Sequence, residues 1–573
     1  MTTRTTRAPG RNSDTGGSPL PLDLDAYIAA GAITAADIAA AATLVRLASS
    51  KDRPLIPDIL AWVAMCLALR TPRDGHTCVD LARIEEWAGD IDLSKPDHLL
   101  WPTGVEAWKA ALTSASLLVG THENDRTPFV LDGNRLYLAR ALFEEREIKR
   151  CLLHIASAPF QNESERVIVL MGGPGTGKTT TVARQLIERF QSSTDVRIAL
   201  AAPTGKAAAR MAEALSRCCQ AEHAPEAVFK AIELARPTTV HRLLGSHPRR
   251  VPRYKFGPDN PLSYDLVVVD EASMLSSSLT YRLLAALSDS TRLLLVGDPN
   301  QLASVDAGSV LADIAAAAIE GTPLHGRSEK LTKRYRFGEQ IGELADAILA
   351  GDATKTIEVL GRGTAEVRWI RPDKQGLATV TAEVVAHGRK LVDLASKHNA
   401  ASDADKMALD KQRELQVLCA HRLGSTGVAG WNARVERELG VLGGSTWYAG
   451  RPVMVTRNSP SLCLFNGDAG LVMNAGGERM QAVFDQGEHV PVTRLEDVTT
   501  VHALTIHKSQ GSEYGHAIVV LPDVKSRLLT RELFYTGVTR AVKHVTVVGS
   551  ADVIRFAVER QIRRASGLAE QLR

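Results

Sequence analysis

The sequence predicts an α/β protein with two sheet-containing domains, an N-terminal helical domain and a small β-barrel-like insertion in the second sheet domain. Short apolar runs such as VIVLM, RIALAA, LVVVD and LLLVG alternate with helical or loop stretches from residue 167 onward. This is the pattern of a parallel sheet covered by helices. The chain has 573 residues, more than one hydrophobic core usually serves.

The composition is that of a soluble protein, with 45% hydrophobic and 23% charged residues. Since no apolar run is long enough for a membrane helix and no signal peptide is visible, we expect a cytoplasmic protein with no membrane partner. Lys and Arg number 68 against 65 for Asp and Glu, a balance that does not by itself indicate nucleic acid. The seven cysteines show no CxxC pair and no zinc-ligand spacing, so we expect reduced thiols.

The first part of the chain lacks catalytic motifs. Residues 1–20 are rich in Thr, Arg, Gly, Ser and Pro and predict a disordered tail. Residues 21–150 carry apolar side chains at helical spacing and predict a helical domain. Its most apolar stretch, 56–69, would face a partner or form the domain's own core.

The two sheet domains are expected at 151–337 and 338–573. In the second, the runs VLCAH, AIVVLP and HVTVVG predict another set of strands. Residues 450–492 contain β-rich runs with Gly and Asn turns, which predict the barrel-like insertion. The polar stretch 396–414 predicts a surface linker or excursion.

A phosphate-binding pattern follows the run VIVLM. Its glycines let backbone N–H groups close around phosphates at the start of a helix. Lys178 is then expected to reach the β and γ phosphates of ATP, and the Thr179 hydroxyl to bind Mg²⁺. The alternative is a chance glycine-rich turn. The pattern GxxxxGK[ST] comprises Gly172, Gly173, Pro174, Gly175, Thr176, Gly177, Lys178 and Thr179.

Polar side chains also follow two later apolar runs. Asp270 and Glu271 follow the run LVVV, at the edge of a sheet where ligands bind. Asp270 is expected to hold Mg²⁺ through a water molecule, and Glu271 to polarise the water that attacks the phosphate. A helix N-cap is the alternative. The run LLLVG leads to Gln301, an amide that can sense the γ-phosphate through a hydrogen bond that hydrolysis removes.

Eight motifs in order resemble those of superfamily 1 helicases. They are GGPGTGKTTT, APTGKAAAR, TTVHRLLG, VVVDEASM, VGDPNQLASVDAG, LTKRYRF, TIHKSQGSEY and LFYTGVTRA. The phrases AHRLGSTGVAGWN and GRPVMVTRNSPSLCLFNGD resemble the RecD (alpha) subunits of RecBCD-type exonuclease V in particular. The resemblance implies two RecA-like P-loop motor domains that move 5′ to 3′ on DNA.

The resemblance also implies a set of nucleotide-site residues. Arg336 and Arg540 match arginines that approach the γ-phosphate from the second motor domain, where they would stabilise the charge of the transferring phosphoryl group. Tyr335 would stack on adenine, or pack in the core. No convincing adenine-reading glutamine precedes the P-loop, since Gln161 lies too close to it, and strict ATP selectivity stays open. The matched residues are Thr180, Gln301, Tyr335, Arg336, Glu513 and Arg540.

For DNA, the resemblance implies contacts from strand-edge loops, where small polar donors suit sequence-independent phosphate binding. Ordinary solvated polar positions are the alternative. Segment 246–261 combines basic residues with aromatic ones, Arg253 and Phe256 among them. At this place the family has a β-hairpin that can part the DNA duplex. A disordered basic loop is the alternative. The other candidates are Thr204, Lys206, His241, Thr505, His507 and Lys508.

The implied function is that of a DNA-dependent ATPase and helicase subunit in double-strand break repair and recombination. The implied partners are single-stranded and duplex-end DNA and RecB-like and RecC-like subunits in a heterotrimer. Residues 21–150 would dock onto the RecC-like subunit, and nuclease activity is expected in a partner chain. A stand-alone RecD-like helicase and a nucleotide-binding structural subunit are the alternatives.

Overall fold

The computed structural model describes most of the chain. The predicted tail 1–20, the candidate site residues Arg253 and Arg336, and the rejected Gln161 lie outside the described residues. Within them, no helix combines the length and apolarity needed to cross a bilayer. The described ranges are 24–50, 55–84, 101–102, 104–122, 125–157, 159, 168–192, 196–246, 254–333, 335, 338–397, 402–441, 447–476, 479–485, 487–526 and 528–573.

The chain forms two compact units. The N-terminal unit comprises Met1–Glu144 together with Ala565–Gly567, and the main unit comprises Glu145–Arg564 with Leu568–Arg573. The division falls inside helix α6 (Ala139–Ser157), a few residues before the domain boundary predicted at 150.

The N-terminal unit contains a small sheet as well as helices, so the prediction of a helical domain was incomplete. The strands pair in the order β1-β4-β3-β2. They have two to four residues each, too few for an alternating pattern to stand out. The elements are α1 (Leu24–Ala29), α2 (Ala35–Ala48), α3 (Ile59–Asp74), β1 (Cys78–Asp80), α5 (Val105–Ser114), β2 (Val119–Gly120), β3 (Phe129–Asp132) and β4 (Arg135–Leu138).

Helix α3 forms the centre of this unit. Its residues from Leu60 to Ala68 are all buried in the unit's hydrophobic core. A helix that is apolar on every side is a core helix, so most of the stretch 56–69 forms the domain's own core. Ile56, just before the helix, stays exposed.

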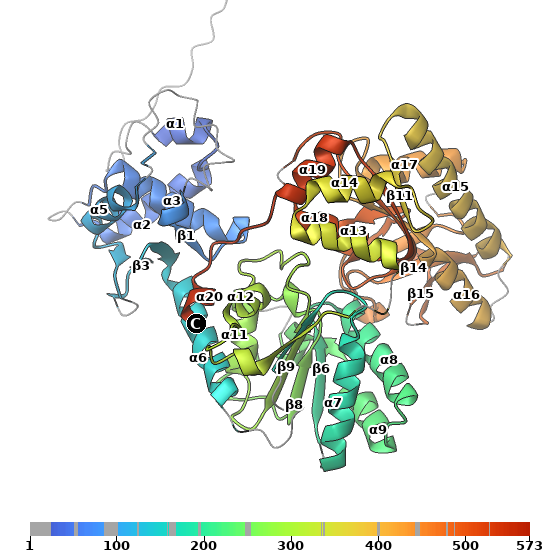
Figure 1. Cartoon of the computed structure of the whole chain (residues 1–573), viewed down its shortest axis with the longest axis horizontal. Helices are drawn as coiled ribbons and strands as arrows, with labels where there is room; N and C mark the ends of the chain where they lie inside the picture. Colours follow the sequence, from blue (N-terminus) through green and yellow to red (C-terminus); the bar gives the residue numbers. More distant parts are fainter. Residues whose placement is uncertain are drawn as a thin grey trace, which may run out of the picture. The chain divides into compact units, whose positions relative to one another are not determined.

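The first sheet domain of the main unit has a six-stranded sheet in the order β10-β5-β9-β8-β6-β7, parallel throughout. Helices α7, α8 and α9 cover one face; α6, α10, α11, α12 and α20 pack on the other (Figure 1). The elements are β5 (Val169–Gly172), α7 (Lys178–Ser192), β6 (Ile198–Ala202), α8 (Gly205–Ala221), α9 (Glu226–Ala235), β7 (Thr238–Thr239), α10 (Val240–Leu243), β8 (Leu266–Val269), α11 (Ser277–Ala285), β9 (Arg292–Gly297), α12 (Val310–Ala317), β10 (Ser328–Leu331) and α20 (Leu568–Gln571).

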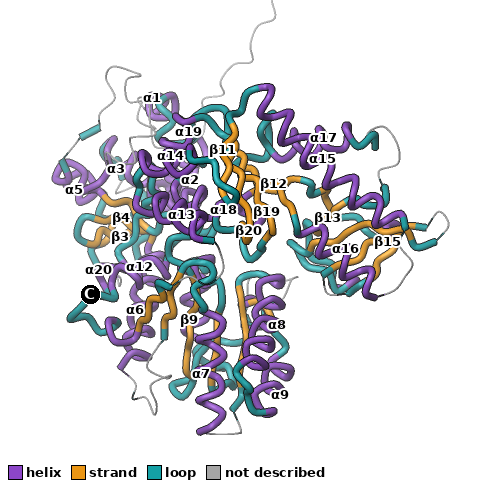
Figure 2. The backbone as a smooth tube through the Cα atoms, turned by 45° about the vertical axis from the view of Figure 1, so that its right-hand side comes forward, coloured by secondary structure: helices purple, strands orange, loops and turns teal. Residues whose placement is uncertain are grey.

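The second sheet domain has a five-stranded parallel sheet in the order β11-β20-β19-β12-β18. Helices α13, α14, α18 and α19 pack on one face, and α15 and α17 on the other (Figure 2). The elements are α13 (Glu339–Ala350), α14 (Ala353–Gly361), β11 (Val367–Ile370), α15 (Lys374–Ser396), β12 (Leu415–Cys419), α17 (Val428–Glu438), β18 (Ala503–Thr505), β19 (Tyr514–Val520), α18 (Arg531–Val538), β20 (Ala541–Val548) and α19 (Ala551–Glu559). The two parallel sheets confirm the predicted α/β class.

The predicted insertion is β-rich, but a barrel is not confirmed. Its strands form an antiparallel sheet in the open order β16-β15-β14-β13-β17. Helix α16 (Ser402–Arg413) occupies the stretch predicted as a linker and packs on this sheet through Ala408 and Leu409, two apolar positions in an otherwise polar sequence. The strands are β13 (Pro452–Val455), β14 (Ala469–Asn474), β15 (Met480–Phe484), β16 (His489–Pro491) and β17 (Val498–Thr500).

Candidate nucleotide site and nucleic-acid surface

The glycine-rich loop lies between the buried strand β5 and helix α7. Gly175 and Gly177 have φ of 75° and 87°, the left-handed region that a glycine adopts without strain. The Lys178 ammonium donates to the carbonyl oxygens of Gly172 at 2.7 Å and Gly173 at 3.0 Å. The unpaired N–H groups at the start of α7 and this ammonium form a site suited to an anion.

Two carboxylates follow strand β8. The Glu271 backbone N–H donates to Asp270 Oδ1 at 2.8 Å. Burial, and next the charge of Glu271, raise the pKa of Asp270 to about 6, although Lys178 opposes this. Glu271 itself has φ 51° and ψ 38°, a left-handed backbone that costs a non-glycine residue energy and that clusters at functional sites.

These donors fit a magnesium ion. A bound Mg²⁺ usually takes one or two protein oxygens and completes its shell with phosphate oxygens and water. Asp270 and the hydroxyl-bearing Thr179 line the same cavity as Lys178. Among the described residues, no cluster of three or more His, Cys, Asp or Glu side chains could hold a metal.

A buried polar chain joins the two sheet domains beside the glycine-rich loop. Arg540 Nη2 donates to Gln301 Oε1 at 2.8 Å, and Gln301 Nε2 donates to Asp298 Oδ2 at 3.2 Å. The Tyr535 hydroxyl donates to the same Asp298 oxygen at 3.0 Å. Arg540 and Gln301 are only 3% and 5% exposed. A buried guanidinium with an amide partner is held in a defined position.

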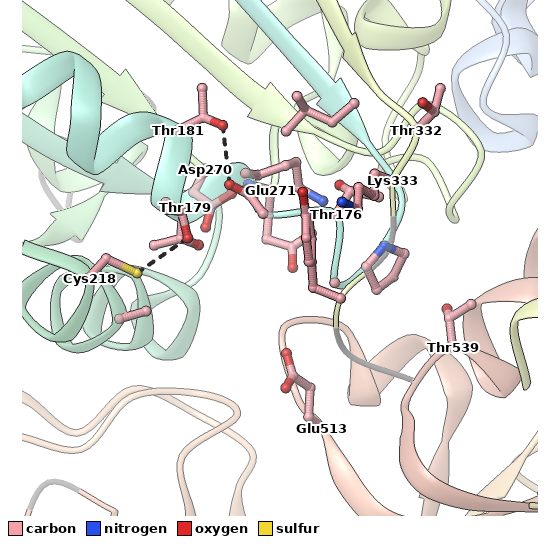
Figure 3. Close-up of a pocket in the computed structure, with 18 of the residues that line it drawn as sticks. Thr176, Thr179, Thr181, Cys218, Asp270, Glu271, Thr332, Lys333, Glu513 and Thr539 are labelled. Atoms are coloured by element: carbon pink, nitrogen blue, oxygen red, sulfur yellow. Dashed lines mark hydrogen bonds between the residues drawn. The ribbon is translucent and has the colours of Figure 1, made fainter. Parts of the chain in front are cut away.

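These groups surround one cavity of about 1160 Å³. Figure 3 shows Asp270 and Glu271 beside Thr176 and Thr179, with Glu513 and Thr539 reaching in from the second sheet domain. The structure thus gathers in one cavity residues that the sequence predicted for the nucleotide site. The described ones that line it are Pro174, Gly175, Thr176, Gly177, Lys178, Thr179, Thr180, Asp270, Glu271, Gln301, Tyr335, Glu513 and Arg540.

Tyr335 lies at the mouth of this cavity. Its backbone N–H donates to the Gly175 carbonyl at 2.8 Å, and the Lys333 ammonium lies 5.2 Å from its ring centre. The side chain is 69% exposed. Because so exposed a ring is not part of a hydrophobic core, the core-packing alternative does not hold, and the ring is free to stack on a flat ligand.

The predicted DNA-contacting threonines have a structural role. Thr204 caps α8 by accepting from the Ala207 N–H at 3.2 Å, and Thr505 accepts from the Lys508 N–H at 3.3 Å. A hydroxyl that accepts one bond still has its own hydrogen to donate. Capping and phosphate binding are therefore compatible at both positions.

The basic candidates differ in accessibility. His241 and Lys508 are exposed and His507 is half-buried. Burial, and next the charge of Arg422, lower the pKa values of His507 and Lys508. Arg422 therefore lies close to both and adds positive charge to this surface. The sequence prediction did not include it, although a basic residue beside strand β12 was a usable signal.

Lys206 lies beneath the insertion sheet. Its ammonium is 3.9 Å from Asp485 Oδ2. Arg413 Nη2 donates to the other oxygen of the same carboxylate, Asp485 Oδ1, at 2.8 Å. Burial, and next the charge of Arg210, lower the pKa of Lys206 to about 8. Nearby, the Arg242 guanidinium lies 5.0 Å from the centre of the Phe465 ring. The insertion sheet therefore covers Lys206, the DNA-binding candidate, in this structure.

The described part of the predicted hairpin, 254–261, folds back on the first sheet domain. Gly257 and Asn260 exchange backbone hydrogen bonds at 3.1 Å, which makes a tight turn. Phe256 packs partly against the domain core, and the Lys255 ammonium lies 5.1 Å from its ring centre. Part of the Phe256 ring is therefore used in packing.

Three family models match the chain. Residues 29–137 match the "RecBCD enzyme subunit RecD, N-terminal domain". Residues 156–307 match an AAA domain, and residues 500–548 match a UvrD-like helicase C-terminal domain. The three matches fall on the N-terminal unit, the first sheet domain and the second sheet domain in turn.

Whole-chain relatives agree with these matches. The chain is 42% identical to the RecBCD enzyme subunit RecD of Mycolicibacterium smegmatis, over 90% of this chain and 94% of that protein. It is 39% identical to the RecD subunit of Mycobacterium tuberculosis, over 96% of each. The ATP-dependent RecD2 DNA helicase of Deinococcus radiodurans is 32% identical over 73% of this chain but only 52% of its own length. From its N-terminal unit to its second sheet domain, this chain belongs to the RecD family of RecBCD enzyme subunits.

Proposed function

We propose that this RecD-family chain, an ATP-dependent DNA helicase, is the motor subunit of a RecBCD-type helicase–nuclease that moves 5′ to 3′ along single-stranded DNA. Its biological setting would be double-strand break repair and recombination. The observation that carries the proposal is the buried Arg540–Gln301 hydrogen bond, which joins the second sheet domain to the first at the edge of the nucleotide cavity.

The residues of the cavity suit phosphoryl transfer from ATP to water. The glycine-rich loop and Lys178 would bind the phosphates and offset their charge. Glu271 would orient the attacking water and take its proton. Thr179 and Asp270 would hold Mg²⁺, which supplies positive charge to the phosphate oxygens when bound. Tyr335 would stack on the base.

Arg540 and Gln301 would couple hydrolysis to movement. Arg540 Nη2 donates to the Gln301 amide oxygen, and a guanidinium has five N–H donors, so Arg540 would offer a further N–H to a phosphate oxygen while Gln301 holds it in position. Arg336 would act as the second arginine. An arginine that arrives from another domain stabilises the transferring phosphoryl group only when the domains close. Closing and opening of the two sheet domains would then be the step along DNA.

DNA would bind through the loops that end the parallel strands. Thr204 and Thr505 would donate their free hydroxyl hydrogens to phosphates, and His241, His507 and Lys508 would add further donors. Lys206 would take part once the insertion sheet uncovers it. Residues 246–261, with Arg253 and Phe256, would part the duplex at a DNA end.

The proposed partners are RecB-like and RecC-like subunits in a heterotrimer, with the N-terminal unit docking onto the RecC-like chain and nuclease activity in another chain. A stand-alone helicase is the second candidate. The RecD2 helicase of Deinococcus radiodurans is matched over only 52% of its length, whereas two RecD subunits are matched over more than nine-tenths, which favours the subunit.

The direction of movement can be tested with the purified chain and partial duplexes. A duplex with a 5′ single-stranded tail should be unwound in an ATP-dependent manner, whereas a 3′-tailed or blunt duplex of the same sequence should not. Lys178→Ala is the matched control, since it removes the phosphate-binding ammonium and leaves the DNA surface unchanged. Preferential unwinding of the 3′-tailed duplex would overturn the assigned direction.

The partners can be tested by co-expressing the chain with RecB-like and RecC-like chains from one organism. Size-exclusion chromatography should then show one complex that contains all three chains. Elution of this chain as a separate species, under conditions where the other two chains co-elute, would favour the stand-alone helicase.

A further inference from the structure

The segment that follows α19 leaves the second sheet domain, contributes three residues to the N-terminal unit and ends in the first sheet domain. We call residues 560–567 the C-terminal strap. They follow α19 in the second sheet domain and precede α20, whose Leu568 is buried in the core of the first sheet domain. The motor mechanism above uses no residue of the strap.

The strap begins on the helix that leads to Arg540. The Arg560 carbonyl accepts from the Arg531 backbone N–H at 2.8 Å. The Ile562 N–H donates to the Glu532 carboxylate at 3.0 Å. Both partners lie in the first turn of α18, so the start of the strap is fixed to this helix.

Arg564 then binds the loop that follows Gln301. We call residues 301–308 the coupling loop. Arg564 Nη1 donates to the Asp306 carbonyl at 2.9 Å and to the Gly308 carbonyl at 2.8 Å, and Nη2 donates to the Ser304 carbonyl. A planar guanidinium holds several acceptors at fixed relative positions, which a lysine ammonium does not.

The coupling loop has few other restraints at this end. Val305, at its tip, is 84% exposed, and Asp306 is exposed as well. The Ser304 hydroxyl donates within the loop, and the Ser277 N–H donates to the Ala307 carbonyl at 2.9 Å. Arg564 therefore supplies the largest set of hydrogen bonds to the loop from outside it, among the residues described.

The other end of the coupling loop belongs to the motor. The Leu302 N–H donates to the Thr536 hydroxyl at 3.1 Å, and Gln510 Nε2 donates to the Leu302 carbonyl at 3.0 Å. Gln301, next to Leu302, accepts from Arg540. A loop fixed at both ends holds its intervening backbone in one place, so the position of Gln301 depends in part on Arg564.

Immediately after Arg564 the chain enters the N-terminal unit. The Ala565 N–H donates to His76 Nδ1 at 2.9 Å, and the Ala565 carbonyl accepts from the Thr77 N–H at 3.0 Å. Ala565 also packs against a small cluster that includes Tyr137 and Leu142. The residue that fixes the coupling loop is therefore bonded covalently to one that is fixed within the proposed docking unit.

We propose that Arg564 is a positioning residue: from the C-terminal strap it holds the coupling loop, and with it Gln301, in place. The inference rests on the proposed function, because it assigns the loop a part in coupling DNA binding to hydrolysis.

The experiment compares the full-length chain with Arg564→Ala, Arg564→Lys and Arg573→Ala. Arg573 is the matched control, since it lies in the same segment and its guanidinium donates to the Ala316 carbonyl at 3.2 Å, outside the coupling loop. The readouts are the ATPase kcat and KM with and without single-stranded DNA, and amide hydrogen exchange of the peptide that spans the coupling loop.

In Arg564→Ala, the amide hydrogens of the coupling loop should exchange faster than in the wild type. The factor by which DNA stimulates kcat should fall by about tenfold, within the usual range of coupling between sites. The KM for ATP and the DNA-free rate should not change. Arg564→Lys should behave like Arg564→Ala, because an ammonium has the same charge but not the planar set of N–H donors of a guanidinium. Arg573→Ala should behave like the wild type.

Two results would overturn the inference. One is faster loop exchange with unchanged DNA stimulation, which would mean that the loop's position does not matter. The other is an equal loss in Arg573→Ala, which would indicate general destabilisation of the tail. If the wild type itself showed no DNA stimulation, the proposed function would fail instead, and the exchange measurement would still report whether Arg564 fixes the loop.

Discussion

Glu271 combines a strained backbone with the position expected of a catalytic base. Its left-handed φ and ψ would suit glycine better, yet a carboxylate is present. Such strain persists only where the surrounding structure enforces it. The chain thus retains a locally unfavourable conformation where its proposed chemistry requires an acidic side chain.

Replacing Glu271 with glutamine should therefore separate binding from hydrolysis. The side chain keeps its shape and the backbone its strain, while proton acceptance is lost. We expect kcat for DNA-stimulated ATP hydrolysis to fall by about 10² to 10⁴-fold, with nucleotide affinity within a factor of a few. Steady-state kinetics and a fluorescent-nucleotide titration measure the two quantities.

Glu339→Gln is a suitable control, because Glu339 is exposed on α13. Normal hydrolysis by Glu271→Gln would remove Glu271 from the mechanism. Loss of nucleotide binding together with hydrolysis would point to a role in the fold of the cavity.

Asp270 makes the stability of the chain depend on pH. Its folded-state pKa is raised to about 6, so the folded chain holds this proton more tightly than the unfolded chain does. As pH rises from the unfolded pKa through the folded one, the carboxylate progressively lowers the free energy of unfolding. At neutral pH the free energy of unfolding is lowered by the full amount, and at pH values below both pKa values it is not lowered at all.

Asp270→Asn should accordingly raise the melting temperature by a few degrees at pH 7.5 and leave it nearly unchanged near pH 4, while abolishing hydrolysis. Thermal unfolding followed at both pH values tests this. Asp289→Asn is the control, since the Asp289 side chain is 97% exposed. A lower melting temperature of Asp270→Asn at pH 7.5 would contradict a destabilising, buried carboxylate.

At the scale of elements, the gathering of the candidate nucleotide-site residues in one cavity was largely predictable from sequence. The runs VIVLM, LVVV and LLLVG form β5, β8 and β9, which are neighbours in one parallel sheet. The carboxyl ends of such strands meet at one edge, so residues that follow them, such as Lys178, Asp270 and Gln301, come together. Local pattern and sheet geometry were sufficient for this.

Long-range packing was not predictable in the same way. The insertion sheet covers Lys206 because Asp485 follows β15, and no periodicity in either segment relates the two residues. The short strands of the N-terminal unit escaped detection for a different reason, since four residues or fewer carry almost no alternation. Arg564 lies in a tail without any recognised motif, so only the structure reveals its contacts.

The covering of Lys206 gives a prediction for the insertion sheet. Asp485→Asn removes a carboxylate from the surroundings of Lys206, Arg210 and Arg413, so the local positive potential should rise. We expect tighter binding of single-stranded DNA by a few-fold, with a steeper salt dependence. Fluorescence anisotropy with an oligothymidylate at two salt concentrations measures both.

Asp410→Asn is the matched control, because Asp410 pairs with the same Arg413 at 3.2 Å, whereas the Lys206 ammonium lies near Asp485. Unchanged or weaker DNA binding by Asp485→Asn would argue that Lys206 does not contact DNA.

At the scale of the whole molecule, the N-terminal unit can be removed to test its proposed docking role. The compact unit ends at Glu144, and Ile148, Leu152 and Ala156 of α6 belong to the core of the first sheet domain. A cut at 144 therefore preserves that core better than one at 150. The shortened chain, 145–573, should keep ATPase activity but lose co-elution with its partner chains.

The circular dichroism and melting curve of the shortened chain serve as the control for folding. If it still assembled with normal affinity, the docking role would have to lie in the second sheet domain or the insertion sheet.

The burial of the final residues also has a consequence for synthesis. Leu568 and Leu572 are 0% and 1% exposed in the core of the first sheet domain, whose strands are made hundreds of residues earlier. While translation continues, that core lacks its last two leucines and the N-terminal unit lacks Ala565. Residues 565–572 must emerge from the ribosome before either core can close, so the first sheet domain exposes this apolar surface to chaperones while the second sheet domain is being made.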